Sequence, residues 1–392
     1  MRDNDAPYLL DVSRMLWRRW SGVRPTGIDR ICMAWLAHFG DRAQATLLHR
    51  HGRHVLGVAA SRALFRSLGQ PEDPPASLSW QRLQLASWFL RHGPGNWRSL
   101  PGRGRLWLNV GHTGLDLPGL ADWVAAAKVR PVLMVHDLIP ITHPEYCRAG
   151  EADRHHARMT AALAIAGAII GNSQDTIDTL AQFAAGQAKQ LPPTLVAWPG
   201  TPHLPVPMQR VDRNDFIILG TIEGRKNHAL LLDLWAHLLA QYGEDAPRLL
   251  IIGRRGWACE DVLARLDAGG FGSRVCETGA LDDAGIADRL AGARALLFPS
   301  WAEGYGLPLA EALAANVPVI ASDLPVFREI GQGVPILLPP DDVAAWRAAI
   351  MAYALPGSTA RADQLDRLKH YRAPDWQSHF SRVEGFLHQL GG

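Results

Sequence analysis

Short apolar runs alternate along the chain with stretches in which apolar residues recur at helical spacing. The helical pattern is clear at Ile28, Ile31, Trp35 and Phe39. Residues 44–60 add one or two strands. The other strand-like runs lie at residues 8–13, 106–110, 131–135, 168–170, 216–219, 249–252, 274–279, 293–298, 317–321 and 334–338. Strands that alternate with helices in this way predict α/β domains with parallel sheets covered on both faces.

A proline-rich segment at residues 192–207 divides this series into two halves. The chain has 392 residues, which is enough for two domains of ordinary size. We predict a Rossmann-like domain at residues 1–205, a second one at 206–371, and a hinge that leaves a central cleft between them. Residues 372–392 have an amphipathic helical pattern, and we expect this helix to pack back on the N-terminal domain.

The stretch 298–322 has the pattern of a strand, a tight turn, a helix and a second strand. Gly304, Tyr305 and Gly306 form the turn, and Pro308 stands at a position that favours the start of a helix. A helix that begins after such a turn directs backbone N–H groups toward an anion. We therefore predict an anion-binding site at this turn.

Two glutamates, Glu303 and Glu311, flank the predicted anion site. A carboxylate beside an anion is unfavourable unless it accepts hydrogen bonds. Sugar or ribose hydroxyl groups would donate such bonds. The pair therefore favours a ligand that carries both phosphate and hydroxyl groups.

A basic pair, Arg225 and Lys226, lies in the turn that follows the apolar run 216–219. Gly220 and Gly224 shape this turn, and a helical pattern begins directly after it. Arginine donates a fork of N–H groups to a diphosphate, and lysine adds a compact charge. The alternative interpretation is a solvated basic turn.

Polar residues follow three of the predicted strands in the first half: His112, His136 and Ser173. Ligands of open parallel sheets bind beyond the carboxyl ends of the strands. A single histidine in this position is more often structural than functional. His136 is the stronger candidate because Asp137 and a long predicted loop at 138–150 follow it at once.

The first predicted strand is followed by a segment at residues 14–25 that is rich in Arg and Trp. We interpret it as a surface loop, either one that contacts a membrane or an acceptor, or one that simply packs its aromatic residues. We predict that a helix begins at Thr26 and Gly27. Two interpretations of the turn before it are open: a turn that offers N–H groups to a phosphate, and an ordinary βα turn. The turn lacks the G-x-G-x-x-G pattern of dinucleotide-binding proteins.

Composition and charge narrow the function classes. The chain is 47% hydrophobic and 20% charged, which argues against disorder. Residues 1–200 carry 22 Lys and Arg against 15 Asp and Glu, while the remainder carries 18 against 23. A basic first half suits an anionic lipid surface or a phosphorylated acceptor, although random drift of surface charge produces the same asymmetry.

The cysteines and the N-terminus indicate the compartment. The four cysteines show neither a C-x-x-C pair nor zinc-site spacing, which favours free thiols in a reducing environment. The N-terminus lacks a signal-peptide pattern, and no run approaches the ~18 apolar residues of a membrane span. We expect a cytoplasmic protein, peripheral on the inner face of the cell membrane, with no nucleic-acid partner.

With these features the chain resembles the retaining glycosyltransferases of family 4, which have the two-domain GT-B fold. Glu303 and Glu311, in their Phe-Pro-Ser-x-x-Glu-Gly-Tyr-Gly context, resemble the E-x7-E motif of that family. Residues 220–227 are similar to its donor-phosphate segment, residues 135–137 to its histidine motif and residues 25–28 to its first loop. The first loop departs from the commoner double-glycine form.

The resemblance implies a role for each matched residue. Glu311 would hold the ribose and Glu303 the donor sugar, while His136 would contact the transferred sugar. His136 and Glu303 are thus the catalytic candidates, and no metal or other cofactor is expected. Besides Glu311, the implied donor-binding residues are Arg225 and Lys226 at the pyrophosphate, the N–H groups of Gly306 and Leu307, and Thr26, Gly27, Gly220, Thr221, Gly304 and Tyr305.

The activity implied by the resemblance is a retaining hexosyl transfer in bacterial polysaccharide synthesis. The donor would be a nucleotide-diphosphate sugar and the acceptor a glycan or polyprenyl-linked glycan, at an anionic membrane surface. The form Gly-Thr-Ile-Glu-x-Arg-Lys-Asn resembles bacterial polysaccharide mannosyltransferases and favours GDP-mannose, with UDP- and dTDP-sugars open. The alternatives are a GT-B sugar-nucleotide epimerase, a non-catalytic nucleotide-sugar-binding protein, and an NAD-dependent dehydrogenase, which the missing fingerprint disfavours.

Overall fold

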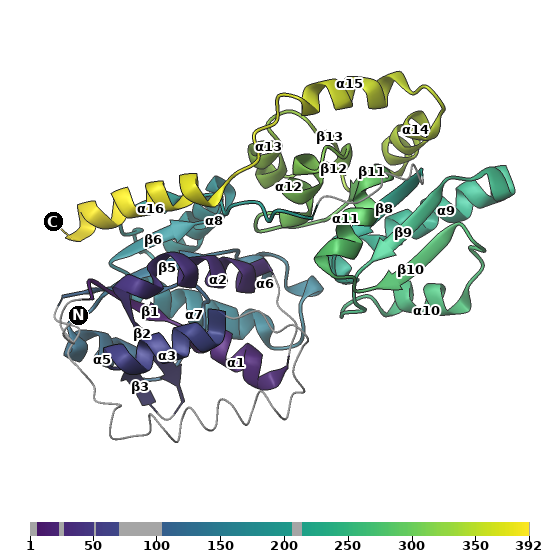
Figure 1. Cartoon of the computed structure of the whole chain (residues 1–392). Helices are drawn as coiled ribbons and strands as arrows, with labels where there is room; N and C mark the ends of the chain where they lie inside the picture. Colours follow the sequence, from purple (N-terminus) through teal and green to yellow (C-terminus); the bar gives the residue numbers. More distant parts are fainter. Residues whose placement is uncertain (1–5, 23–26, 51, 70–103, 206–213, 392) are drawn as a thin grey trace. The chain divides into compact units, whose positions relative to one another are not determined.

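The computed structural model describes residues 6–22, 27–50, 52–69, 104–205 and 214–391 (Figure 1). Contacts divide the chain into two compact units, each with its own sheet. The first unit comprises Met1–His136, Asp153–Pro199 and Trp376–Gly392, and the second comprises Asp137–Ala152 and Gly200–Asp375. This division differs in two ways from a single boundary near residue 205. The internal segment Asp137–Ala152 groups with the second unit, and the C-terminal segment Trp376–Gly392 groups with the first.

The first unit is built on a mainly parallel sheet. Among the described residues its strand order is β3-β2-β1-β4-β5-β6-β7, and only β2 and β3 pair in antiparallel fashion. The strands are β1 (Tyr8–Asp11), β2 (Ala43–His49), β3 (Gly52–Val55), β4 (Leu106–Asn109), β5 (Arg130–Val135), β6 (Ala168–Gly171) and β7 (Thr194–Val196). The helices are α1 (Ser13–Ser21), α2 (Gly27–Phe39), α3 (Val58–Gly69), α5 (Leu120–Ala127), α7 (Glu151–Ile165), α8 (Gln174–Ala185) and α16 (Trp376–Gly391), with a 3-10 turn η1 (Gly40–Arg42).

Side chains that alternate along the strands bury both faces of this sheet. On β1, Leu10 joins a core with residues of α2, α3 and α16, whereas Leu9 joins a second core with residues of α5 and α7. Trp107 and Leu108 on β4 divide between the two cores in the same way. Strands that are apolar on both faces explain why the sequence shows continuous apolar runs here.

The second unit is built on a parallel sheet whose strand order, among the described residues, is β10-β9-β8-β11-β12-β13. The strands are β8 (Asp215–Leu219), β9 (Arg248–Ile252), β10 (Val275–Gly279), β11 (Ala293–Phe298), β12 (Val319–Ser322) and β13 (Ile336–Leu338). The helices are α6 (Ile139–Thr142), α9 (His228–Tyr242), α10 (Glu260–Ala268), α11 (Asp283–Ala291), α12 (Leu307–Ala314), α13 (Pro325–Gly331), α14 (Val343–Ala354) and α15 (Thr359–Leu368), with 3-10 turns η3 (Pro144–Tyr146), η4 (Gly224–Lys226) and η5 (Gly243–Asp245). The prediction of two parallel-sheet α/β domains is confirmed.

Each sheet has one point at which the order of its strands reverses. In the first sheet this point lies between β1 and β4, and in the second it lies between β8 and β11. Loops that leave the carboxyl ends of two such strands diverge to opposite faces and leave a crevice in which ligands bind. The turn after β8 carries the basic pair, Arg225 and Lys226, and the turn after β11 carries the predicted anion site at Gly304, Tyr305 and Gly306.

Two segments predicted as loops contain helices. Residues 13–21 form α1, because the segment has no Gly or Pro inside it and includes the helix-forming residues Arg, Met and Leu. Gly22 ends this helix in the left-handed conformation, with φ of 63°. Residues 138–150 contain α6 and η3, each of which has a proline in its first turn.

Helix α16 closes one face of the first unit. Phe380, Val383 and Leu387 are buried in the core that also holds residues of α2 and α3. The Trp35 indole N–H donates a hydrogen bond of 3.1 Å to Nε2 of His379. Nδ1 of His379 lies 3.0 Å from the Trp198 carbonyl oxygen, so the neutral ring satisfies both neighbours.

We expect the stability of the first unit to fall as the pH is lowered from about 6.5 toward 4. Burial lowers the pKa of His379 to about 4, against hydrogen bonds to Trp198 and Ala197 that raise it. Between this value and about 6.5 the unfolded chain binds the extra proton, so stability is lost on acidification. Urea unfolding followed at several pH values measures the slope.

The variant His379→Phe serves as the control for this titration. It should be less stable than wild type at pH 7 by about 1–3 kcal/mol, because Trp35 loses its acceptor. Its stability should depend less steeply on pH between 4 and 6.5. If the unfolding free energies of the two proteins depend on pH with the same slope, His379 is not the group responsible.

Candidate functional site

The turns after β8 and β11 are bonded to each other in the second unit. The Trp301 N–H donates to the Arg225 carbonyl oxygen at 2.8 Å. In return, Nη1 of Arg225 donates to the Ala302 carbonyl oxygen at 3.0 Å. These bonds fix the two turns at the reversal point of the sheet and bring together residues that are 77 positions apart in the chain.

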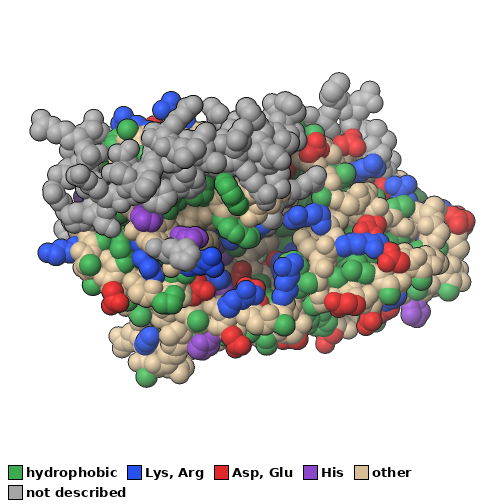
Figure 2. All heavy atoms as spheres, turned by 90° about the horizontal axis from the view of Figure 1, so that it is seen from below, with side chains coloured by type: hydrophobic (Ala, Val, Ile, Leu, Met, Phe, Trp, Pro, Cys, Tyr) green, Lys and Arg blue, Asp and Glu red, His purple; other side chains and the backbone are tan. Residues whose placement is uncertain are grey.

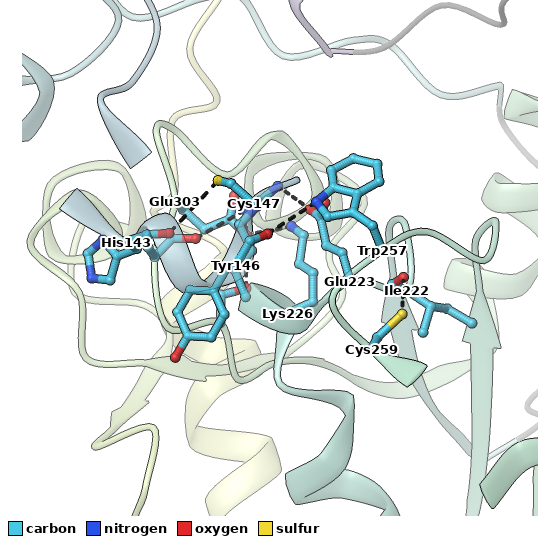
Figure 3. Close-up of polar contacts among 12 residues, drawn as sticks. His143, Tyr146, Cys147, Ile222, Glu223, Lys226, Trp257, Cys259 and Glu303 are labelled. Carbon is cyan, nitrogen blue, oxygen red and sulfur yellow. Dashed lines mark hydrogen bonds and ion pairs between the residues drawn. The ribbon is translucent and has the colours of Figure 1, made fainter. Parts of the chain in front are cut away.

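A buried ion-pair cluster lies between these turns (Figure 3). Oε1 of Glu303 lies 2.5 Å from Nζ of Lys226 and 2.7 Å from Nη1 of Arg225. The Ser300 hydroxyl donates a third bond of 2.8 Å to the same oxygen. The side chains of Lys226 and Glu303 are only 6% and 7% exposed, so their charges interact with little screening by solvent.

A second carboxylate completes the cluster. Oε1 of Glu223 lies 2.6 Å from Nη2 of Arg225, so the guanidinium lies between two carboxylates. The cluster therefore contains two cations and two acidic side chains. The sequence predicted that the basic pair would face phosphate and that Glu303 would face a sugar. In the structure the basic pair and Glu303 also pair with each other.

The charge states of the cluster follow from burial and from these pairs. Burial by itself would raise the pKa of Glu303, but Arg225 and Lys226 lower it to about 2. Burial lowers the pKa of Lys226, and Glu303 opposes this effect. Burial raises the pKa of Glu223, with Arg225 and Lys226 acting against it. Glu303 is thus a carboxylate at neutral pH.

The backbone around the basic pair takes conformations that depend on residue type. Gly220 has φ of 138°, which only glycine adopts readily. Asn227 has φ of 56° and caps η4, and its side-chain N–H group donates to the Pro340 carbonyl oxygen at 2.9 Å. Nζ of Lys226 lies 4.3 Å from the centroid of the Phe298 ring, an additional cation–π contact.

Gly306 precedes α12 and determines how this helix begins. Its φ is 93°, and a Cβ atom there would lie 2.6 Å from Cε1 of Phe327. Leu307 is the first residue of α12, and Pro308 lies in its first turn. Tyr305 and Glu311 are buried beside these residues, on the turn and on the helix respectively. The predicted turn and the N-terminus of the helix are therefore present.

The other predicted site residues lie in the first unit. His136 follows β5 directly and is buried, with Nε2 at 2.6 Å from the Val110 carbonyl oxygen. Its ring centroid lies 4.9 Å from that of His112, which follows β4. Gly27 is the first residue of α2, and Thr26 lies outside the described residues.

Several residues of the site were missed by sequence reasoning. Glu223 and Ser300 lie two and three positions before Arg225 and Glu303, so proximity in the chain was a usable signal. Tyr146 and Trp257 could not be paired from sequence. The Trp257 indole N–H donates to the Tyr146 carbonyl oxygen at 3.1 Å, beside the turn that carries the basic pair (Figure 3).

Other features of the described chain bear on ligands and partners. Among the described residues, no group of three or more His, Cys, Asp or Glu side chains is arranged to hold a metal ion. The helices within the same ranges lack the combined length and apolar character that a membrane span requires. On the face drawn in Figure 2, basic and acidic side chains are interspersed over the described surface.

Both the sequence and the fold of this chain match those of known proteins. Residues 213–354 match the family model "Glycosyl transferases group 1", a range that contains the whole ion-pair cluster. The chain is 28% identical over 241 residues to the serotype-specific mannosyltransferase WbdA of Escherichia coli, a match to 56% of this chain and 29% of that protein. It is 33% identical over 136 residues to the O-antigen chain mannosyltransferase B of Escherichia coli, covering 34% of this chain and 35% of that protein.

The chain therefore spans only about a third of the length of these two relatives. A structural match covers nearly the whole chain. The crystal structure of Anabaena Alr3699/HepE in complex with UDP-glucose aligns with a TM-score of 0.65 and 16% sequence identity, over 97% of this chain and 99% of that one. The chain has the GT-B fold of glycosyltransferases, as predicted.

We expect Gly306→Ala to destabilise the second unit more than Gly357→Ala. Gly357 also has positive φ, 67°, but a Cβ atom there meets nothing within 4 Å. Alanine at Gly357 should cost about 1–2 kcal/mol from backbone strain, and alanine at Gly306 should cost about 1–3 kcal/mol more from the contact with Phe327. Thermal unfolding of both variants measures the difference, and equal melting temperatures would refute the steric argument.

Proposed function

We propose that this protein is a retaining glycosyltransferase that uses a nucleotide-diphosphate sugar. The observation that carries the proposal is the buried cluster of Arg225, Lys226 and Glu303 at the reversal point of a parallel sheet. A buried basic pair beside the start of a helix suits a diphosphate. The match to the group 1 glycosyltransferase model over the same residues supports this reading.

In this proposal Arg225 and Lys226 hold the diphosphate of the donor. The first turn of α12, with the N–H groups of Gly306 and Leu307, provides further donors. The proposed donor-binding residues also include Gly220, Thr221, Gly304 and Tyr305 in the surrounding turns, together with Thr26 and Gly27. Positive charge from the basic pair stabilises the departing diphosphate, so the proposed reaction uses no metal ion or other cofactor.

The carboxylates and the histidine bind hydroxyl groups in this proposal. Glu311 holds the ribose, Glu303 holds the transferred sugar, and His136 contacts the same sugar. The bond between the anomeric carbon and the phosphate oxygen breaks while the acceptor oxygen bonds to that carbon from the same face. The acceptor proton passes to the leaving phosphate, and the anomeric configuration is retained.

GDP-mannose is the favoured donor and a glycan or polyprenyl-linked glycan the favoured acceptor. Two of the relatives reported above are named mannosyltransferases, and one of these is named for the O-antigen chain. The complex of HepE with UDP-glucose keeps a uridine donor open as the second candidate. An epimerase or a non-catalytic sugar-nucleotide binder would bind the same donors without transferring the sugar to an acceptor.

Helix α1 is the element through which we propose that the protein touches an anionic membrane. Trp17 and Trp20 are 58% and 42% exposed. The two residues between them, Arg18 and Arg19, are the basic residues in the last turn of the helix. The helix has no acidic residue in its first turn. Tryptophan flanked by arginine favours the boundary between lipid headgroups and acyl chains.

We expect Glu303→Gln and Lys226→Met each to lower kcat/KM for sugar transfer by about 10²–10³-fold. Lys226→Met removes positive charge that stabilises the departing diphosphate, and Glu303→Gln removes the carboxylate that accepts hydrogen bonds from the transferred sugar. Transfer is measured by mass spectrometry with a panel of GDP-, UDP- and dTDP-sugars. The control is Asp323→Asn, which breaks an exposed ion pair with Arg328 in the same unit and should leave transfer unchanged. Full activity of either site variant would remove that residue from the site.

A folding control accompanies these variants, since removing one partner of a buried pair leaves an uncompensated charge. The double variant Lys226→Met/Glu303→Gln removes one charge of each sign and should melt closer to wild type than Lys226→Met does. If it melts normally and still transfers sugar, the catalytic role of the cluster is wrong.

We expect the double variant Trp17→Ala/Trp20→Ala to bind vesicles that contain anionic phospholipid about tenfold more weakly than wild type. Vesicle sedimentation measures the binding. Tyr242→Ala, at an exposed aromatic residue of the second unit, is the matched control and should bind like wild type. Equal binding of all three proteins, or equal binding of wild type to neutral vesicles, would exclude α1 as the contact.

A further inference from the structure

Glu223 is a buried carboxylate that the proposed mechanism does not use. It lies in the turn after β8 and is 4% exposed. In the described part of the chain, its carboxylate pairs with the Arg225 guanidinium at 2.6 Å. A buried carboxylate is unfavourable unless it is paired, so its presence beside a proposed phosphate-binding residue requires a reason.

The turn that carries Glu223 is held rigidly. The Lys226 N–H donates to the Glu223 carbonyl oxygen at 3.0 Å, and the Gly224 N–H donates to the Trp257 carbonyl oxygen at 3.3 Å. A Cβ atom on Gly256 would lie 2.7 Å from the Ile222 carbonyl oxygen, so the turn and residue 256 are in close contact. These contacts position the backbone from which the buried Glu223 carboxylate reaches Arg225.

Tyr146 and Trp257 enclose the same turn. A Cβ atom on Gly224 would lie 3.2 Å from Cδ1 of Tyr146 and 2.4 Å from the Ala258 carbonyl oxygen. The Arg148 guanidinium lies 4.5 Å from the centroid of the Trp257 ring, and this indole donates to the Tyr146 carbonyl oxygen (Figure 3). The backbone between Glu223 and Arg225 is thus packed on both sides.

The two carboxylates of the cluster differ in their surroundings. Glu303 accepts from Lys226, Arg225 and Ser300, so its charge is shared among three donors. Glu223 faces Arg225 and directs negative charge at the same guanidinium that would hold a diphosphate. Two anions that share one guanidinium repel each other, and the repulsion is strong where solvent is excluded.

We propose that Glu223 is a fixed counter-anion that weakens the grip of Arg225 on a diphosphate. The inference rests on the proposed function and deepens it: Glu223 limits the affinity for the nucleoside diphosphate product and thereby promotes its release. In the donor-free chain the same carboxylate compensates the buried charge of Arg225. Glu223 thus stabilises the empty site and destabilises the product-bound site.

The test is calorimetric titration of the full chain with GDP, with UDP and with dTDP. Glu223→Gln keeps the size and a hydrogen-bond acceptor for Arg225 but removes the negative charge. We expect the best-bound nucleotide to bind about tenfold more tightly to this variant than to wild type. The product-inhibition constant in the transfer assay should fall by the same factor.

Two further variants separate charge from shape. Glu223→Asp keeps the charge, and its affinity for the nucleotide should lie within about twofold of that of wild type. Glu223→Ala removes the charge and the contact with Arg225, and this variant should still bind the nucleotide more tightly than wild type. Glu244→Gln removes an exposed carboxylate that pairs with Arg274 in the same unit and should change nothing.

The results distinguish failure of the inference from failure of the proposed function. If wild type binds a nucleotide and both Glu223→Gln and Glu223→Ala bind it equally or more weakly, Glu223 is a positioning residue for Arg225 and the inference is wrong. If neither wild type nor the charge-removing variants bind GDP, UDP or dTDP, the proposed function itself is wrong. Melting temperatures near that of wild type establish that the variants compared are folded.

Discussion

The site of the second unit depends on one buried carboxylate, that of Glu303. Its Oε1 atom forms ion pairs with Lys226 and Arg225 and accepts a hydrogen bond from Ser300. The ion pairs join the turn after β8 to the turn after β11. An isolated carboxylate at this depth would take up a proton, but two cations in contact with it keep it ionised. Neither turn could keep its buried charges without the other, so the geometry of the site follows from this contact.

The topology of the sheet explains why these two turns meet. β8 and β11 are neighbours in space, although three helices and two strands separate them in the chain. The turns after the two strands therefore lie at the reversal point of the sheet, where ligands of such sheets bind. Gly220 and Gly306 allow the backbone to turn sharply at its two sides because both have positive φ. The sheet thus supplies the position and the glycines supply the shape.

Much of the fold could be predicted because local patterns determine it. Strands with both faces buried appear as continuous apolar runs, and Ser173 caps α8 by accepting from the Thr176 N–H at 3.1 Å, as its position before the helix suggests. Predictions were wrong where local composition pointed the other way. An abundance of Arg and Trp at residues 14–25 suggested a loop, yet helix propensity and burial of Met15 produce α1 over residues 13–21.

The two-sheet α/β architecture, the turns at Gly220 and Gly306, and the residue types at these turns could be predicted, since they follow from periodicity and backbone preference within a few residues. Which charges pair became clear only from the folded chain. Glu223 pairs with Nη2 of Arg225 and Glu303 with Nη1, and Trp257 bonds to Tyr146 across 111 positions of the chain. Ion pairs and packing depend on distances between elements far apart in sequence, which no local pattern specifies.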